Sequence, residues 1–295
     1  MGGTEPYGQL RSRIADISGV VMVIGGADTG KTTVARLLFM DALEAGRTVA
    51  YVDADLAAST VGPAGCVGLS IVEPGDSLEA FSDPDDLRFV GAVEPNGVVL
   101  PHVVAVAALV DVARTRADLI VVDTTNVVSG VVGQTLKYHI TELIKPEIIV
   151  ALSTGSELDP VIGMLRRFLS VRVAEIDPPD GIIPQSPVEH QLAGAAAFHK
   201  DLGDNPPRWR VQTTVFAPTL PAGFDVARLD GMLVGVQDEH GRCLGLGVLE
   251  HDDEAVRVAT RHGENMRGLR LGSIRIDLDT FATSRVRLRE LIFGV

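Results

Sequence analysis

A glycine-bounded segment near the N-terminus carries the residue types that bind phosphate. Residues 25–32 of the 295-residue chain read GGADTGKT and fit the pattern G-x-x-x-x-G-K-[ST]. In this pattern the glycines let successive backbone N–H groups curl around phosphate oxygens, and the following helix adds partial positive charge at its N-terminus. Lys31 supplies a movable cation, and the Thr32 hydroxyl can bind Mg²⁺. The sequence therefore predicts a site for a nucleoside triphosphate. The residues expected to contact it are Gly25, Gly26, Ala27, Asp28, Thr29, Gly30, Lys31, Thr32 and Thr33.

Carboxylates placed after apolar runs complete the candidate chemistry. Asp53 and Asp55 follow the run 47–52, and Asp123 ends the run ADLIVVD. A parallel α/β sheet presents its reactive groups at the carboxyl ends of its strands, where a carboxylate beside a phosphate loop reaches the Mg²⁺ shell. We therefore predict a metal site built from Thr32, Asp53 and Asp123. Asp53 and Asp55 could share the metal or divide metal and base roles; the alternative for such a pair is a helix cap or a turn.

Strands and helices alternate around these residues. The apolar run 20–24 leads into the loop, and apolar residues at helical spacing follow it. Further buried strands are expected at 47–52, 117–123, 147–152 and 171–176, and helices at 101–115, 132–143, 158–169 and 188–202. Glycines and prolines break up the segment 56–100, which we interpret as a loop region on the substrate side. The alternation predicts an α/β fold of the P-loop NTPase type, with a mostly parallel sheet flanked by helices.

The pattern changes in the last third of the chain. Short strands separated by turns are expected at 232–236, 243–249, 255–259, 269–278 and 285–291. In the fourth of these the apolar alternation slips beside Gly272, as a β-bulge would cause. We expect a nucleotide-binding domain at 1–205, with a proline-rich lid region at about 177–202, and a small β-rich domain at 206–295.

Charge and hydropathy limit the classes of partner. The net charge of −13 disfavours a broad nucleic-acid footprint, yet residues 256–290 hold eight arginines against four acidic residues. This basic stretch is either a surface facing phosphates or an ordinary charged face. No apolar run approaches the ~20 residues that span a bilayer, and the N-terminus lacks the apolar core of a secretory signal. Cys66 and Cys243 lie far apart without metal-ligand spacing, which suits buried or inert thiols. We expect a cytoplasmic protein without membrane contact.

Several segments, in order, resemble one family of enzymes. The family's phosphate loop is matched by GGADTGKTT, and its D-x-D-x-G-Q-S segment with the downstream P-G is similar to DADLAASTVGPAG at 53–65. Its T-x-G-W-v-x-G…L…li-k-P-d-ivv stretch is similar to DTTNVVSGVVGQTLKYHITELIKPEIIVAL at 123–152. Its C-terminal β domain is similar to GMLVG at 231–235 and GRCLGLGVL at 241–249. The chain resembles the polynucleotide 5′-hydroxyl kinases, which include the RNA kinase of tRNA splicing and pre-mRNA cleavage, the pre-ribosomal RNA-processing kinases and archaeal relatives.

The resemblance implies transfer of the ATP γ-phosphate to the 5′-hydroxyl end of a polynucleotide, RNA in preference to DNA, with Mg²⁺ as the metal. By position, Lys31 would hold the β- and γ-phosphates, Thr32 would bind the Mg²⁺, and Asp55 would orient or deprotonate the attacking hydroxyl. ATP is the default nucleotide because no N-K-x-D guanine-reading motif follows the run 147–152. The polynucleotide 5′ end is the implied substrate, and the C-terminal β domain leaves room for a protein partner.

The sequence departs from the family pattern at several active-site positions. The Gly-Gln after D-x-D is here Ala57-Ala58, and the Gly-Trp after the second signature strand is Asn126-Val127, which removes a face for base stacking. Where the family's lid has R-S-x-x-x-R-x-x-x-R, the best alignment places Gln185, Ser186, His190 and Gly194. Nearby arginines that could replace those of the lid are Arg166, Arg167 and Arg172. Two other functions therefore stay open: a slow ATPase or nucleotide-gated switch acting through a protein partner, and a small-molecule P-loop kinase.

Overall fold

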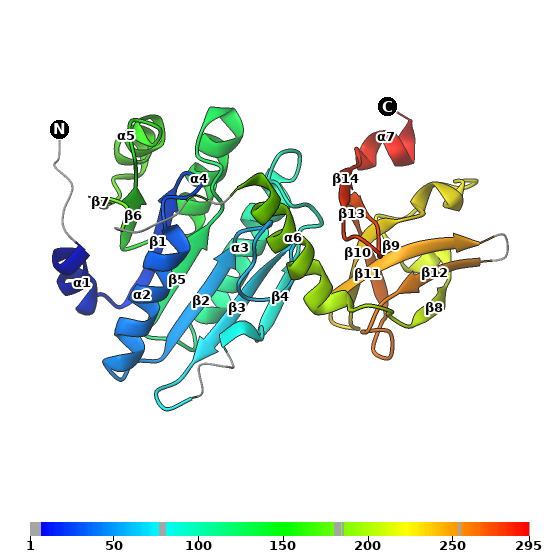
Figure 1. The fold of residues 1–295 in the computed structure, drawn as a ribbon, viewed down its shortest axis with the longest axis horizontal. Coiled ribbons are helices and arrows are strands. Elements are labelled where there is room, and N and C mark those ends of the chain that lie inside the picture. The colour runs from blue at the N-terminus through cyan, green and yellow to red at the C-terminus, as the bar shows by residue number, and fades with distance from the viewer. Residues whose placement is uncertain (1–6, 77–80, 180–183, 185, 253–254, 295) are drawn as a thin grey trace.

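The computed structural model describes residues 7–76, 81–179, 184, 186–252 and 255–294. Within these residues, the first two thirds of the chain forms a seven-stranded sheet between layers of helices (Figure 1). In sheet order the strands are β4 (Asp86–Phe89), β3 (Cys66–Val72), β2 (Val49–Ala54), β5 (Leu119–Thr124), β1 (Gly19–Gly25), β6 (Ile148–Leu152) and β7 (Val173–Ile176). Strands β2, β5, β1, β6 and β7 run parallel, and β3 and β4 continue the sheet in antiparallel pairs. The expected fold class is confirmed, and the sheet is mixed.

Helices cover both faces of this sheet because its central strands are apolar on both sides. Alternate residues of β1 point to opposite faces, Met22 and Ile24 to one and Val21 and Val23 to the other. The first face is covered by α3 (Val99–Ala113), α4 (Gly130–Ile144) and α5 (Asp159–Leu169). The second face is covered by α1 (Tyr7–Ala15) and α2 (Lys31–Glu44). Because the strands are parallel, their carboxyl ends lie at one edge of the sheet, which is where the sequence predicts the reactive groups.

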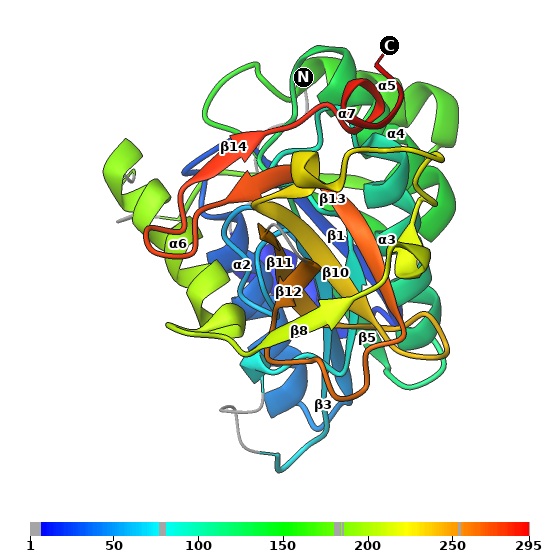
Figure 2. The same cartoon turned by 90° about the vertical axis from the view of Figure 1, so that its right-hand side faces the viewer.

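A second sheet follows, and α6 (Pro187–Leu202) lies between the two sheets (Figures 1 and 2). Its path is β14 (Thr283–Arg285), β13 (Gly268–Ile276), β10 (Met232–Gln237), β11 (Cys243–Asp252), β12 (Ala255–Ala259) and β8 (Arg208–Val211). The remaining elements are β9 (Phe216–Ala217), which pairs parallel with β13, the single turns η2 (Thr213–Val215) and η3 (Val226–Leu229), and α7 (Leu288–Phe293). The pairs along this path are antiparallel, and residues such as Val234, Leu249 and Leu271 form a core of their own. The expected C-terminal β unit is present.

The two sheets join at a packed seam beside β4. Phe89 of β4 lies over Gly235 of β10, where an added Cβ would come within 2.4 Å of the ring. The backbones also meet, because the Ser273 N–H donates to the Gly91 carbonyl at 2.7 Å. Close side-chain packing and a direct backbone hydrogen bond thus hold β10 and β13 against the end of β4.

The two cysteines meet at this seam. Cys66 lies on β3 and Cys243 on β11, and both are buried. The hydrogen bond between their side chains and their burial raise the pKa of the Cys66 thiol. Apolar neighbours such as Phe198 and Leu246 belong to the same buried cluster. The expectation of buried thiols is confirmed, and their contact depends on how the two sheets pack, which their spacing in the sequence does not reveal.

Two sequence-based expectations are wrong. The expected loop region 56–100 contains β3 and β4, which pair with β2 and with each other. Its glycines and prolines form the turns between these short strands. The expected strand 285–291 is instead the end of β14 followed by α7. Leu288, Leu291 and Ile292 meet the second core from one helical face, so a helix buries them better than a strand would. Helix α1 and strand β8 lie outside all expected elements.

The β-bulge expected beside Gly272 is present. Met232 of β10 pairs with Arg275 of β13, whereas Val234 pairs with Leu271, so β13 has extra residues around Gly272. The phase slip in the apolar pattern therefore marks a real irregularity in pairing. It lets β13 keep apolar residues on the core side both before and after the bulge.

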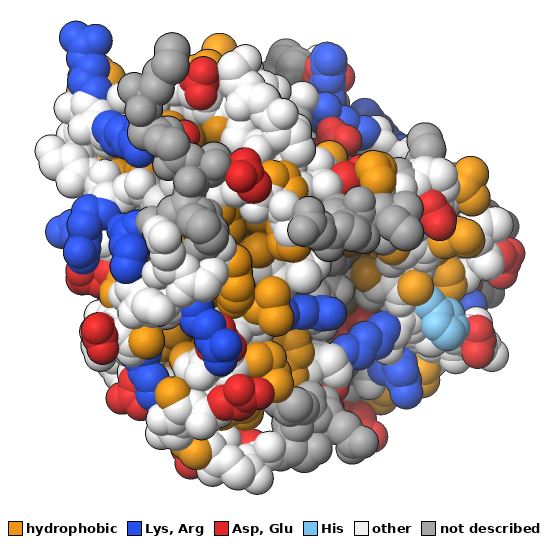
Figure 3. Space-filling view, turned by 60° about the vertical axis from the view of Figure 1, so that its left-hand side comes forward, with side chains coloured by type: hydrophobic (Ala, Val, Ile, Leu, Met, Phe, Trp, Pro, Cys, Tyr) orange, Lys and Arg blue, Asp and Glu red, His pale blue; other side chains and the backbone are white. Residues whose placement is uncertain are grey.

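The surface carries mixed charge on the face toward β7. Lys and Arg side chains are interspersed there with Asp and Glu (Figure 3). Among the described helices, none combines the length and apolar character needed to cross a bilayer.

Candidate functional site

The predicted phosphate loop connects β1, which ends at Gly25, to α2, which begins at Lys31. A Cβ on Gly25 would come within 2.6 Å of the Thr29 hydroxyl and 2.8 Å of the Leu152 carbonyl oxygen, so the position needs glycine. Gly30 precedes the helix with a φ of 80°, a left-handed conformation that favours glycine. No side chain caps the start of α2. Its first N–H groups therefore remain available to phosphate oxygens.

The Lys31 side chain lies within the loop. The residue is 7% exposed, and its Nζ donates to the Gly26 carbonyl at 2.6 Å. Burial lowers the pKa of this amine, whereas the negative charges of Asp123, Asp55 and Asp28 raise it. The three carboxylates therefore lie close enough to act on the amine electrostatically. The structure brings together the cation and the carboxylates that the sequence placed on separate strands and loops.

Asp123 lies at the end of β5 beside the start of α2. Its Oδ2 accepts hydrogen bonds from the hydroxyls of Thr32, at 2.7 Å, and Tyr51, at 2.9 Å. Burial raises the pKa of Asp123, and these two hydrogen bonds oppose the rise.

The other oxygen of Asp123, Oδ1, is buried and has no hydrogen-bond partner in the described part of the chain. Buried polar atoms are normally paired, so this oxygen fits a cation. Mg²⁺ is usually held by one or two carboxylates together with substrate phosphates, which suits a carboxylate and a hydroxyl beside a phosphate loop. Across the described ranges, no group of three or more His, Cys, Asp or Glu side chains is arranged to hold a metal ion.

Asp53 organises the segment that follows β2. Its Oδ1 accepts from the Asp55 N–H at 3.0 Å, and its Oδ2 accepts from the N–H groups of Thr60 and Val61 at 2.5 and 3.0 Å. Burial and the neighbouring charge of Asp123 raise the pKa of Asp53 to about 8. These bonds close the loop that carries Asp55, whose Oδ1 accepts from the Ala57 N–H at 3.0 Å. The metal-ligand role of Asp53 stays a prediction, because both of its oxygens already accept hydrogen bonds.

Lys137 of α4 is a buried cation that the sequence reasoning missed. Its Nζ donates to the Thr124 hydroxyl at 2.7 Å and to the Thr125 carbonyl at 2.6 Å. Burial and the charge of Lys31 lower the pKa of this amine to about 7. Lys137 thereby fixes the end of β5 directly after Asp123. A signal was present in the sequence, since Lys137 lies on the apolar face of its helix, three residues before Ile140.

Two further basic residues support the same edge of the sheet. His102 of α3 is fully buried, and its Nε2 lies 2.9 Å from the Ala54 carbonyl oxygen. Burial lowers the pKa of His102 to about 4, so the imidazole is neutral near pH 7. Arg36 of α2 donates to the Thr60 hydroxyl at 3.3 Å, which links the helix after the phosphate loop to the loop that carries Asp55. Periodicity predicts burial for His102, but nothing local predicts either contact.

Helix α6 lies against the phosphate loop and the loop of Asp55. His190 Nε2 is 3.7 Å from Asp28 Oδ1, so α6 and the phosphate loop make direct electrostatic contact when the imidazole is protonated. Ser186 begins the helix through a capping box. A Cβ on Gly194 would lie 3.8 Å from the Ala57 carbonyl oxygen. Residues 186–194, which the alignment matched to the family's lid, therefore lie next to the phosphate loop and the loop of Asp55.

The other departures from the family pattern lie at the same edge. Asn126 is exposed and Val127 is half-buried directly after β5, and Ala58 is exposed in the loop after β2. Gln185 lies outside the described residues. None of these described side chains offers an aromatic face or a positive charge to the site.

The nearby arginines are held elsewhere. Arg166 is paired with Glu175 of β7 at 2.8 Å, and Arg172 is paired with Glu147 at 3.3 Å. Glu147 precedes β6, so Arg172 lies at the edge of the sheet opposite the phosphate loop. Arg167 is exposed on α5. Within the described residues, none of the three forms a hydrogen bond or ion pair with the phosphate loop.

A phosphate loop between β1 and α2, with a strand-end carboxylate bonded to the helix threonine, defines the class of the P-loop NTPases. Comparison with known families makes the assignment narrower. Residues 25–200 match the family described as mRNA cleavage and polyadenylation factor CLP1 P-loop, and the chain belongs to that family. The resemblance drawn from the sequence motifs is confirmed.

Named relatives extend over most of the chain. A polyribonucleotide 5′-hydroxyl-kinase of Thermococcus kodakarensis is 28% identical, covering 92% of this chain and 92% of that protein. One of Methanocaldococcus jannaschii is 26% identical, covering 87% of each. The rat polyribonucleotide 5′-hydroxyl-kinase Clp1 is 26% identical, covering 83% of this chain and 58% of that protein. The solved wild-type Clp1p–Pcf11p complex is similar in fold, with a TM-score of 0.69 at 16% identity over 91% of this chain and 78% of that chain.

Proposed function

We propose that this protein is a polynucleotide 5′-hydroxyl kinase, which transfers the γ-phosphate of ATP to the 5′-hydroxyl end of RNA in preference to DNA. The observation that carries the proposal is that Lys31 and Asp123 are both bonded at the phosphate loop, with Asp55 close enough to act on the Lys31 amine. Phosphoryl transfer needs positioned phosphates, charge neutralisation and a group that orients the nucleophile. The names of the archaeal relatives support RNA as the substrate.

The phosphate-binding roles follow from the contacts. The loop 25–33 would bind the triphosphate through its backbone N–H groups and the start of α2. Lys31, which donates to Gly26 in this structure, would hold the β- and γ-phosphates. Thr32 and Asp123 would hold Mg²⁺, which neutralises charge on the transferred phosphoryl group when bound. Because Lys137 bonds the residues just after Asp123, it keeps that carboxylate at the site.

Asp55 is the proposed group for the attacking hydroxyl. The 5′-hydroxyl oxygen forms a bond to the γ-phosphorus, and the bond from that phosphorus to the β–γ bridging oxygen breaks. ADP leaves with the electron pair, and the hydroxyl proton passes to the Asp55 carboxylate. Asp53 fixes the backbone of Asp55 through its hydrogen bond to the Asp55 N–H. Asp53 would thus act as a positioning residue, alongside its predicted place near the metal.

A slow ATPase or nucleotide-gated switch is the second candidate, and the lid favours it. Gln185, His190 and Gly194 stand where the family's lid pattern has arginines. An arginine that stabilises the transferring phosphoryl group is worth ~10³–10⁵ in rate. A switch would act through a protein partner, and we propose the second sheet as its docking unit. We also propose the division into domains 1–205 and 206–295, with 177–202 as the lid.

The test is transfer of labelled γ-phosphate from ATP·Mg²⁺ to 5′-hydroxyl oligonucleotides of RNA and DNA. Asp55→Asn should lower kcat by ~10²–10⁴ because proton transfer loses its base. Lys31→Ala should weaken ATP binding and turnover. The control Asp111→Asn removes a carboxylate on α3 that is 71% exposed, and it should leave turnover unchanged. ATP hydrolysis without any labelled oligonucleotide, across both polymers and several lengths, would replace the kinase by the switch.

A further inference from the structure

Three adjoining hollows form a groove along the seam between the two sheets. The first, of about 380 Å³, is lined by Ala57 and His190 and so borders the loop of Asp55 and the lid. The second, of about 190 Å³, shares Val93 and Thr283 with the first. Shared lining residues place the hollows side by side, in a row along the seam. The groove therefore begins at the candidate catalytic loop and continues away from it.

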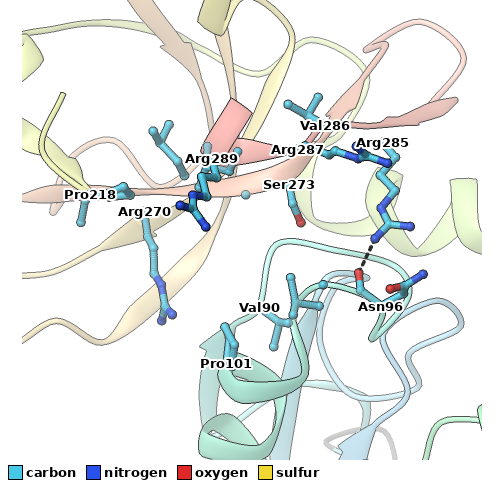
Figure 4. Close-up of a pocket in the computed structure, with 16 residues that line it drawn as sticks. Val90, Asn96, Pro101, Pro218, Arg270, Ser273, Arg285, Val286, Arg287 and Arg289 are labelled. Atoms are coloured by element: carbon cyan, nitrogen blue, oxygen red, sulfur yellow. Dashed lines mark hydrogen bonds between the residues drawn. The ribbon is translucent and has the colours of Figure 1, made fainter. Parts of the chain in front are cut away.

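The third hollow, of about 610 Å³, shares Asn96, Ser273 and Arg285 with the second. Its lining holds four arginines from β13, β14 and the start of α7, namely Arg270, Arg285, Arg287 and Arg289 (Figure 4). These are half of the eight arginines that give the segment 256–290 its positive charge. The basic stretch of the sequence is thus gathered at the far end of the groove.

Two of these four arginines use their side chains for contacts within the protein, and two do not. Arg285 donates to the Asn96 carbonyl at 2.7 Å, and Arg287 is paired with Glu290 at 2.7 Å. The side chains of Arg270 and Arg289 form no hydrogen bond or ion pair with any described residue. Both extend toward the wall of the hollow that carries Val90 and Pro101 (Figure 4).

The rest of the lining suits a strand of nucleic acid. Pro218, which is exposed, and Pro101 and Leu288, which are partly exposed, provide apolar surface for bases and riboses. Helix α3 begins at this wall without a side-chain cap, which adds partial positive charge. Among the residues that line the three hollows, Glu94 is the one acidic side chain. The groove is therefore electropositive in a chain whose net charge is −13.

We infer that this groove binds the RNA strand downstream of its 5′ end, with Arg270 and Arg289 on the backbone phosphates. The inference rests on the proposed kinase function. A 5′-hydroxyl placed at Asp55 leaves the rest of the strand to continue past Ala57, where the groove begins. A single strand is bound by a positively charged groove that follows its backbone, together with surfaces that contact its bases. A row of hollows that starts beside Ala57, next to the reacting end, favours RNA over an acidic protein segment, for which the position of Ala57 would have no use.

Kinetics on substrates of two lengths test the inference. The wild-type protein should phosphorylate a 5′-hydroxyl RNA of 20 nucleotides with a lower KM than a trinucleotide. The double variant Arg270→Ala/Arg289→Ala should raise the KM of the long RNA roughly fivefold to tenfold near physiological salt and leave its kcat unchanged. The slope of log KM against log salt should fall by about 1.4, since each lost phosphate contact accounts for ~0.7. The trinucleotide should react as in the wild type.

A matched control removes the same charge elsewhere on the second sheet. Arg210 of β8 and Arg242 before β11 are exposed and line none of the three hollows. The variant Arg210→Ala/Arg242→Ala should keep the wild-type KM and salt slope. An unchanged KM for the long RNA in the groove variant would overturn the inference and favour a protein-docking role. An equal effect of both double variants would overturn it too, because the loss would then reflect net charge alone.

Photocrosslinking of the wild-type protein provides a second measurement that needs no variant. RNA carrying 4-thiouridine at single positions from the third nucleotide onward should crosslink to peptides containing 268–276 or 285–292. Crosslinks confined to residues outside 90–101, 268–276 and 285–292 would overturn the inference. Failure of the wild type to phosphorylate even the trinucleotide would instead contradict the proposed function, so the two failures are distinguishable.

Discussion

Replacement of Lys137 by methionine tests whether a buried amine beneath the phosphate loop titrates as the structure indicates. The pKa of this amine falls from its ordinary 10.5 to about 7, because burial penalises its charge and Lys31 repels it. Each pKa unit corresponds to about 1.4 kcal/mol. Keeping Lys137 protonated at or below pH 7 therefore lowers the free energy of unfolding by roughly 4–5 kcal/mol, relative to a lysine with its ordinary pKa.

The sign of the pH dependence follows from proton binding. Between pH 7 and pH 10 the unfolded amine keeps its proton while the folded amine loses it, so the unfolded state binds more protons. The free energy of unfolding of the wild type should then rise by roughly 3–4 kcal/mol across this window relative to the methionine variant. Methionine also leaves the Thr125 carbonyl without its donor, at a cost of about 1–3 kcal/mol. The variant should be the more stable protein at pH 7 and the less stable one at pH 10.

Urea unfolding of both proteins at pH 7, 8, 9 and 10 without nucleotide measures this difference directly. Ionisations common to both proteins cancel when the two free energies are subtracted. As a control, Lys145→Met removes an exposed lysine from the end of the same helix. If the difference for Lys137→Met varied with pH no more than that for this control, the buried amine would have an ordinary pKa and the electrostatic reasoning would be refuted.

Other predictions concern the backbone that supports the site and the metal that the site would bind. Gly68→Ala should destabilise the protein by about 1–3 kcal/mol in thermal unfolding and lower turnover, because its Cβ would meet the Val61 carbonyl oxygen, in the loop of Asp55, at 2.1 Å. Gly163→Ala, on an open face of α5, should instead stabilise the protein by up to about 1 kcal/mol without changing turnover. Thr32→Ala should raise the Mg²⁺ concentration for half-maximal rate by roughly tenfold or more, measured by Mg²⁺ titration of the kinase assay. Removal of divalent cations with EDTA should abolish transfer, and added Mg²⁺ should restore it; transfer that persists in EDTA would count against the metal site.

Local sequence patterns predict the phosphate loop well because its chemistry is local. The two end glycines, Lys31 and Thr32 act within one strand–loop–helix unit, so their spacing alone defines the site. Carboxylates at strand ends are nearly as easy to predict, since the parallel pairing of β5 with β1 places Asp123 at the same edge of the sheet as the phosphate loop. Strand β4 buries Leu87 and Phe89 against the second sheet, a contact that no local pattern predicts. Strand β3 packs mainly in the first core, but the glycines and prolines around these short strands made the segment resemble a loop.

Contacts between distant segments were the least predictable part of the site. Whether Asp53 binds a metal or holds a loop depends on where the N–H groups of Thr60 and Val61 lie. Helix α6 shows the same dependence, because the partner of its His190 is Asp28, a loop residue far from it in the chain. The segment of α7 was wrongly predicted as a strand, because its core-facing residues are so close together in the sequence that helical and strand periodicities both fit.

The seam between the sheets has a consequence for how this enzyme can move. Phe89 seated on Gly235 and the hydrogen bond from Ser273 to Gly91 tie the two halves together at short range. Such a joint resists hinge-like opening. The distance between the two walls of the groove is therefore set when the chain folds. Capture and release of a polymer would then depend on displacement of α6 alone, and a covalent tether from α6 to either sheet should trap the molecule in one stage of its cycle.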